Sequence, residues 1–244
     1  RDGDRLGFPV FPTNWTTADG ELYSGYREKG YFPGAFINML AFLGWNPGTN
    51  QELFTLEELV ESFSLERVNK AGAKFDAEKT KWFQQQYLRQ TSNKELASLL
   101  SQKLTENCDL SRLEAICALI KERATFIDDI RIEGAYLLHK PENYDEKTCK
   151  KKWKGQASSH MKEWLIVLSE VESFTAENIE SSFKSFLEHK ELGIGGVLPL
   201  FRLLITGLGT GPSMFEIASF LGKAECIDRI NTGLTKLGET SVQS

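Results

Sequence analysis

The segment from Gly30 to Trp45 constrains the fold more than any other stretch of this sequence, because it carries both stop and start signals for helices. Gly30 is a helix stop, since glycine enters the left-handed backbone region at little cost. Pro33 opens the next helix, where a missing N–H costs nothing, and Gly44 is placed to close it. Between them, apolar side chains recur at helical spacing, at Phe36, Met39, Leu40 and Leu43. The segment predicts a helix–Gly–Pro–helix packing unit, and its physics assigns it no chemistry.

The rest of the chain also has helical patterns. Thr55 with Glu58 and Ser92 with Glu95 have the spacing of capping boxes, and Asp76 is placed to start a further helix. Thr175 begins another helix. Apolar stripes follow these starts, at Trp82, Phe83, Tyr87 and Leu88, at Leu96, Leu99, Leu100 and Leu104, at Leu110, Leu113, Ile116, Leu119 and Ile120, and at Ile179, Phe183, Phe186 and Leu187. Strand-like alternation over four or more residues is scarce. The predicted fold class is all-α.

Composition excludes some classes of protein. No run approaches 18 apolar residues, so we expect no membrane span, and the charged start lacks the apolar core of a signal peptide. The four cysteines are scattered without a Cys-x-x-Cys pair, which favours buried or indifferent thiols in a reducing cytoplasm. The net charge of −5 argues mildly against a general nucleic-acid binder. An RNA partner would require basic groups gathered on one face and salt-dependent binding.

Two breaks in the apolar rhythm suggest domain boundaries. The first is the polar break at residues 90–93. The second is residues 140–155, where Pro141, Asn143 and a lysine run intervene. The predicted domains are therefore residues 1–91, 92–140 and 141–244. Each of the three is slightly acidic, and there is no internal repeat.

A glycine-rich run at residues 207–211 superficially mimics a dinucleotide-binding fingerprint, with Glu225 and Asp228 nearly 20 positions beyond it. The Rossmann fold needs several strands alternating with helices, and none is predicted before residue 197. The third glycine also falls one position early. We therefore expect a loop between helices, and Gly222 with Lys223 fits a helix C-cap rather than a phosphate-binding loop.

No catalytic or metal-binding constellation is predicted. The three histidines, His139, His160 and His189, are far apart and form neither a metal pair nor a nucleophile's base. Asp128 and Asp129 fit a solvated helix end better than a cation site.

The densest group of basic side chains is the lysine cluster, formed by Lys147, Lys150, Lys151, Lys152 and Lys154 with Trp153 among them. Lysines beside an aromatic ring can hold phosphates and stack a base. A solvated linker or helix face explains the same residues. Both interpretations remain open from the sequence.

Several separate segments resemble bacterial glutamyl-tRNA synthetases. Residues 30–45 resemble the part that follows the family's ATP-binding lysine loop. Further matches occur in the same order as in that family, at Glu52 to Leu59, Val68 to Ala71, Phe75 to Trp82, Thr175 to Asn178, Pro199 with Leu200, Arg202, Thr206 with Gly207, Gly211 with Pro212, Phe215 to Ile217 and Leu221 to Lys223. The resemblance implies an α-helical stem-contact domain at 1–91. It also implies two small α-helical domains, at 92–140 and 141–244, that cage the anticodon.

The same resemblance implies what this chain does and lacks. In the family the lysine loop reads Lys-Leu-Ser-Lys-Arg-x-Gly, and this sequence starts Arg1-Asp2-Gly3, so Arg1 would be a remnant of the ATP loop. The Rossmann domain that makes glutamyl-adenylate would then be missing. We expect a monomeric, cytoplasmic chain that binds tRNA(Glu) without aminoacylating it and needs no cofactor. ATP and Mg²⁺ are expected for the intact enzyme.

The resemblance also assigns candidate anticodon contacts. Arg123 matches an arginine that inspects the last anticodon base, which is C in glutamate tRNA and G in glutamine tRNA. Cytosine offers O2 and N3 acceptors to a guanidinium, whereas guanine offers mainly donors there. Arg202 matches a second arginine, for phosphate or base. The loop that holds the splayed bases matches Gly211, Pro212, Met214 and Phe215. Some family members have a hydroxyl residue where Gly211 stands, so a side-chain bond there would be lost.

Other interpretations compete, one for two of these residues and two for the function of the chain. Core packing is the alternative role of Met214 and Phe215. A free-standing helical protein–protein interaction module on the same scaffold is the alternative function, and the acidic balance of the chain suits it. A small enzyme is a third interpretation, for which the sequence shows no catalytic constellation. Salt-sensitive retention of tRNA would distinguish the tRNA-binding function from the protein–protein interaction module.

Overall fold

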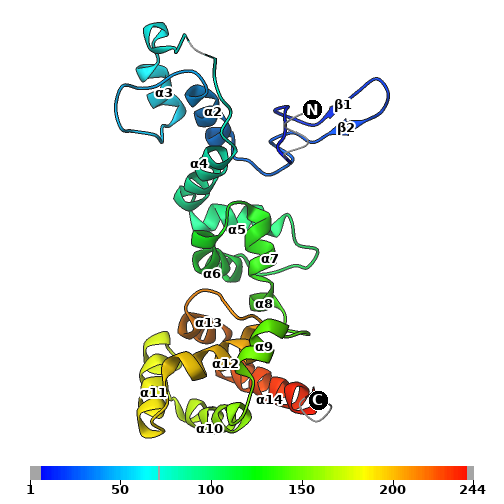
Figure 1. Ribbon diagram of the computed structural model, residues 1–244, viewed down its shortest axis with the longest axis vertical. Helices are drawn as coiled ribbons and strands as arrows, with labels where there is room; N and C mark the ends of the chain where they lie inside the picture. The colour runs from blue at the N-terminus through cyan, green and yellow to red at the C-terminus, as the bar shows by residue number, and fades with distance from the viewer. Residues whose placement is uncertain (1–6, 71, 241–244) are drawn as a thin grey trace. The chain divides into compact units, whose positions relative to one another are not determined.

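The computed structural model describes residues 7–70 and 72–240, and the chain divides into two compact units between Ile132 and Glu133 (Figure 1). The first unit begins with a short antiparallel hairpin and is otherwise helical. Its elements are β1 (Trp15–Thr16), β2 (Leu22–Tyr23), α2 (Pro33–Phe42), α3 (Leu56–Ser62), the 3-10 turn η1 (Leu65–Arg67), α4 (Ala77–Gln90), α5 (Asn93–Ser101), α6 (Leu110–Ile120), the 3-10 turn η2 (Lys121–Arg123) and α7 (Ile127–Glu133). In the hairpin, Trp15 pairs with Tyr23 and Thr16 with Leu22.

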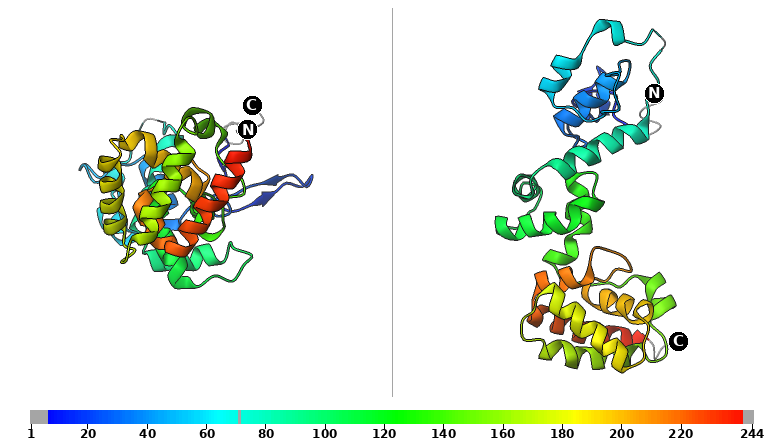
Figure 2. Two further views of the ribbon diagram at one scale, coloured as in Figure 1. Left: turned by 90° about the horizontal axis from the view of Figure 1, so that it is seen from below. Right: turned by 90° about the vertical axis from the view of Figure 1, so that its left-hand side faces the viewer.

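The second unit contains only helices in the part that the structure describes. These are α8 (Ala135–Leu138), α9 (Glu146–Lys152), α10 (Ala157–Glu170), α11 (Ala176–His189), α12 (Ile194–Thr206), α13 (Met214–Leu221) and α14 (Lys223–Thr240). α10 packs against α11, α12 and α14, and α13 packs against α11 (Figure 2). The fully buried rings of Trp164, Phe183 and Phe201 meet where these helices converge, with 4.8 Å between the centroids of Trp164 and Phe183. This aromatic centre holds the second unit together.

A buried amide organises the first unit. Gln84 of α4 accepts the N–H of Phe32 at 2.8 Å and donates to the carbonyls of Gly30 and Thr125, at 3.3 and 3.1 Å. Its side chain is fully buried, so each of these bonds forms away from competing water. One α4 residue thereby fixes both the turn before α2 and the segment that follows η2.

Most of the local helix signals are confirmed. Thr55 and Glu58 form a reciprocal capping box at α3, and Asp76 accepts the N–H of Lys79 at the start of α4. The side chains of Ser92 and Thr175 accept the N–H groups of Glu95 and Asn178 at the starts of α5 and α11. The all-α prediction is confirmed as well, because the small β1–β2 hairpin is the sole sheet among the described residues.

Some details of the sequence prediction are wrong. Gly44 does not close α2, which ends at Phe42 with Leu43 as a right-handed cap. Gly30 has the expected left-handed backbone, with φ of 88°, but it ends a turn rather than a helix. Leu40 and Leu110, counted in the apolar stripes, are 47% and 55% exposed. The periodicity therefore located these helices but not every inward face.

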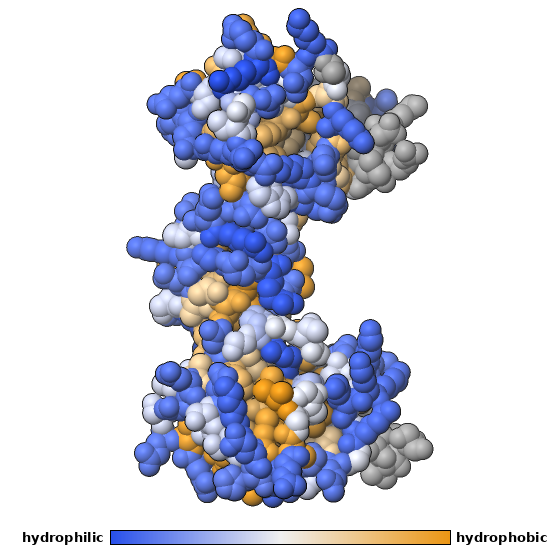
Figure 3. Space-filling view, turned by 60° about the vertical axis from the view of Figure 1, so that its left-hand side comes forward, coloured by the Kyte–Doolittle hydropathy of each residue, from blue (hydrophilic) through white to orange (hydrophobic). Residues whose placement is uncertain are grey.

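The predicted three-domain division stays a prediction. Its boundary after residue 91 lies inside the first unit, between α4 and α5, and its boundary after residue 140 lies inside the second, between α8 and α9. Over residues 7–70 and 72–240, no helix combines the length and the apolar content that crossing a membrane requires. Exposed apolar side chains occur singly or in small groups among hydrophilic ones, as Figure 3 shows for one face.

The cysteines are unpaired thiols, as expected. Burial raises the pKa of Cys117 to about 11 and that of Cys226 to about 12. Both thiols are therefore held in the unreactive protonated form.

Candidate functional site

Two of the residues assigned from sequence, Gly211 and Pro212, lie on the connection between α12 and α13, residues 207–213, which we call the α12–α13 loop, and Arg202 contacts this loop from α12. Arg202 of α12 donates from Nη2 to the carbonyl of Pro212 at 2.6 Å. A Cβ built on Gly211 would lie 2.6 Å from Nη1 of Arg202, closer than real contacts allow. Gly211 therefore leaves the space in which the guanidinium lies against the loop.

Met214 and Phe215 follow the loop but point into the core. Their exposed fractions are 2% and 8%, and the ring of Phe215 lies 5.7 Å from that of Phe183. Ser213 caps α13 by accepting the N–H of Glu216. The structure thus gives Met214 and Phe215 the packing role that was the alternative from sequence, and their side chains anchor the end of the loop.

The glycines at the start of the loop serve close packing. Gly207 ends α12 with a left-handed φ of 74°, and its carbonyl accepts the N–H of Asp145 at 2.8 Å. A Cβ on Gly207 would lie 2.5 Å from the carbonyl oxygen of Asn143, and one on Gly209 would overlap the hydroxyl of Thr148. The glycine-rich run is therefore shaped to receive residues 143–148, and the expectation of a loop between helices is confirmed.

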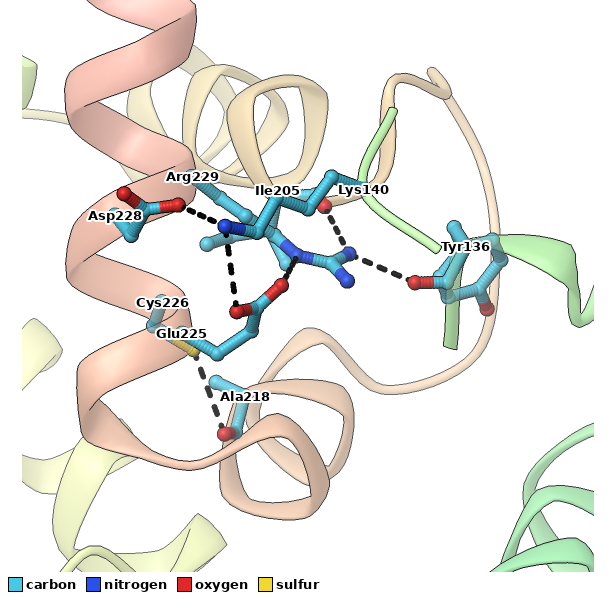
Figure 4. Close-up of polar contacts among 8 residues, drawn as sticks. All are labelled: Tyr136, Lys140, Ile205, Ala218, Glu225, Cys226, Asp228 and Arg229. Atoms are coloured by element: carbon cyan, nitrogen blue, oxygen red, sulfur yellow. Dashed lines mark hydrogen bonds and ion pairs between the residues drawn. The ribbon is translucent and has the colours of Figure 1, made fainter. Parts of the chain in front are cut away.

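A buried guanidinium supports the start of the α12–α13 loop (Figure 4). Arg229 of α14 is 2% exposed, and its Nε donates to Glu225 at 2.8 Å. Its Nη1 donates to the carbonyls of Tyr136 and Ile205, at 2.7 and 2.9 Å. Since Ile205 lies one turn after Arg202, this contact fixes the end of α12 from which the loop departs.

The two acidic residues that follow the glycine-rich run, Glu225 and Asp228, belong to the same network. Glu225 pairs with Arg229, and Lys140 forms ion pairs with Asp228 and Glu225 at the solvent edge. The hydrogen bond to Asp228 raises the pKa of Lys140. These carboxylates are thus occupied by structural cations, which agrees with the rejection of a dinucleotide site.

Arg123 lies in the first unit, at the end of η2, and its side chain is exposed. The two residues before it tie η2 to the end of α4. Lys121 donates to the carbonyl of Thr91 at 3.4 Å, and Arg89 donates to the carbonyl of Glu122 at 2.5 Å. The buried Ala124 follows directly. Arg123 is therefore an exposed cation on a well-fixed backbone.

Arg1, the predicted remnant of an ATP loop, lies outside the described residues. Asp129 accepts the N–H groups of Thr125 and Phe126 ahead of α7, while Asp128 pairs with Lys103 and Arg131. Across the described part of the chain, no group of three or more His, Cys, Asp and Glu side chains is placed to hold a metal ion.

The residues that support the loop were not identified from sequence. Asn143, Thr148 and Arg229 do so through backbone groups or through the space left by a glycine, and neither relation has a sequence signature. The i, i+4 spacing of Glu225 and Arg229 on one helix is the single available signal. It predicts an ion pair but not its burial.

Comparisons with known proteins agree with the resemblance. The family model described as the anticodon binding domain matches residues 85–234, and the model of the class I tRNA synthetase (E and Q) catalytic domain matches residues 20–82. Glutamate–tRNA ligases from Flavobacterium johnsoniae and Christiangramia forsetii are 48% and 42% identical, each over 97% of this chain and 48% of the relative. A crystal structure of a glutamate tRNA ligase from Elizabethkingia meningosepticum is 41% identical, with a TM-score of 0.90 over 97% of this chain and 48% of that one. The chain spans about half the length of the relatives it matches.

We expect Gly211→Ala to displace the guanidinium of Arg202, because the new methyl group would occupy its place. Without the hydrogen bond to Pro212, the free energy of unfolding should fall by about 1.5 kcal/mol, the lower end for a bond from a charged group. Urea denaturation measures this. Gly193→Ala is the matched control, since a Cβ there meets nothing within 4 Å. In an Arg202→Ala background, Gly211→Ala should cost little, and an undiminished cost in that background would contradict the steric explanation.

We expect Arg229→Met to lower the free energy of unfolding by roughly 3–5 kcal/mol, because it leaves two buried carbonyls without their donor and leaves the partly buried carboxylate of Glu225 with only the longer ion pair to Lys140. Urea denaturation followed by tryptophan fluorescence would measure the change. Lys140→Met is the control from the exposed edge of the same network and should have a much smaller effect, because solvent screens its ion pairs. Equal effects of the two substitutions would show that burial of the guanidinium is not what matters.

Proposed function

This chain belongs to the anticodon-binding-domain family of the tRNA synthetases, in the branch formed by the glutamate–tRNA ligases, and from that membership we propose that it binds tRNA and reads the anticodon of glutamate tRNA. The observation that carries the proposal is the span of the family match, residues 85–234. That span contains both the exposed Arg123 and the α12–α13 loop with its arginine.

Arg123 is the residue we propose to inspect the last anticodon base. Its guanidinium is exposed, always charged and carried on a backbone that Arg89 and Lys121 hold to α4. A cytosine presents O2 and N3 acceptors to such a group, and a guanine presents mainly donors. Discrimination between glutamate and glutamine tRNA would follow from this difference.

The α12–α13 loop is the second proposed contact, through Gly211 and Pro212. Both are partly exposed, so the backbone of the loop is accessible to a splayed base. Arg202 holds the loop through its hydrogen bond to the Pro212 carbonyl, while the buried side chains of Met214 and Phe215 anchor the end of the loop in the core. We therefore propose that Arg202, Met214 and Phe215 act mainly by holding the loop in its binding shape.

The wider role follows from the relatives. We propose that the intact protein is a cytoplasmic, monomeric enzyme that ligates glutamate to tRNA with ATP and Mg²⁺, and that residues 1–91 act as its stem-contact domain. Residues 92–140 and 141–244 would then be the two anticodon-binding domains. The names of the relatives and the partial match to a class I catalytic domain support this proposal.

Titration of this chain with transcribed glutamate and glutamine tRNAs at two salt concentrations tests the proposal. We expect preferential binding of glutamate tRNA that weakens as salt rises, because phosphate contacts release counterions. Fluorescence anisotropy or filter binding would measure the affinities. Equal affinities would leave a tRNA-binding chain whose specificity resides elsewhere, and salt-independent absence of binding would favour the helical protein–protein interaction module.

Arg123→Gln should reduce the discrimination between the two tRNAs by about 1–3 kcal/mol, the scale of one good base contact. The same titration measures it, with Arg112→Gln on the exposed surface of α6 as a control of equal charge change. An equal loss of affinity for both tRNAs would make Arg123 a phosphate contact. An unchanged affinity for both would remove it from the site.

A further inference from the structure

The lysine cluster is not used by the proposed anticodon contacts, and the structure divides its members into two groups. Lys152 is partly buried and donates from Nζ to the carbonyl of Gly195 at 2.9 Å. That carbonyl would otherwise bond the N–H of residue 199 within α12, but residue 199 is a proline and has none. Lys152 thus has a structural role, since it satisfies a carbonyl that Pro199 leaves open.

Lys147, Lys150 and Lys151 form the second group, which we call the lysine face. They are spaced by three and four positions on α9, so they lie on one side of the helix, and all three are exposed. With Asp145 and Glu146 they line a surface hollow of about 560 Å³. Glu146 pairs with Lys150 at 3.2 Å, a solvent-exposed pair that competing anions can replace.

The position of α9 is fixed at both ends. At its start, the N–H of Asp145 bonds to Gly207, and Thr148 occupies the space beside Gly209. At its end, Lys152 bonds to α12. The lysine face therefore lies on a helix that is attached directly to the α12–α13 loop.

We propose that the lysine face binds the sugar–phosphate backbone of the RNA whose anticodon the α12–α13 loop contacts. The inference rests on the proposed function and adds a phosphate-binding surface to it. Residues 145–154 hold five lysines against two acidic residues, although the net charge of the whole chain is −5. Positive charge is therefore concentrated in this segment, where it attracts a polyanion. Nearby phosphate contacts position the RNA and carry no sequence information.

The test is a triple substitution, Lys147→Gln, Lys150→Gln and Lys151→Gln, with Lys152 left intact. We expect the affinity for glutamate tRNA to fall at least tenfold at low salt. The slope of log affinity against log salt should become shallower by roughly two, since each phosphate that the protein neutralises contributes about 0.7 to it. The ratio of affinities for glutamate and glutamine tRNA should stay unchanged, and the three arginine replacements should restore binding.

The matched control is Lys162→Gln, Lys184→Gln and Lys190→Gln, which removes the same charge from exposed positions on and beside α10 and α11 in the same unit. Thermal unfolding of both triple variants verifies that they fold. If the lysine-face variant binds tRNA as the control does, the lysine face does not bind the RNA, while the anticodon proposal stands. If the unaltered chain shows no salt-sensitive tRNA binding, both proposals are overturned.

Discussion

The burial of the Arg229 guanidinium is the constraint on which the second unit depends. A charge in the interior is tolerated only when it is paired and its hydrogens are satisfied. Arg229 meets this condition by drawing together Glu225 of its own helix, the carbonyl of Tyr136 and the carbonyl of Ile205. Three segments far apart in the sequence must therefore meet at one point. The α12–α13 loop starts from that point, so its shape follows from a contact it does not itself make.

Sequence predicted what is decided locally. The caps at Thr55 and Asp76 form because the hydroxyl or carboxylate and the N–H it accepts lie within three residues, and these were placed correctly. The exposure of Leu40 and Leu110 depends on which neighbours cover a helix, and periodicity does not contain that information. The β1–β2 hairpin has two residues in each strand, too few for alternation to be visible. Sequence thus predicts features that neighbouring residues determine, and it misses features that depend on tertiary contacts.

The candidate site shows the same limit. The family resemblance assigned Arg202 and Gly211 to one site, but only as separate positions. From sequence, the glycine at position 211 implied that a side-chain hydrogen bond found in some family members would be lost. The structure shows why a small residue is needed there, because the guanidinium of Arg202 lies against it. From sequence alone, an apolar pair such as Met214 and Phe215 fits base contact and core packing equally well. Burial distinguishes the two, and burial depends on α11, which is remote in sequence.

The acidic net charge of the chain, which argued mildly against RNA as a partner, is a weak argument when the positions of the charges are known. At physiological ionic strength a charge is screened within about 8 Å, so a phosphate responds to the few groups nearest to it and not to the total of −5. Pro199 also divides the lysine cluster, because the carbonyl it frees engages Lys152 and fixes the helix that carries the other lysines. A proline that removes one hydrogen-bond donor from α12 therefore determines where the positive charge of α9 is presented.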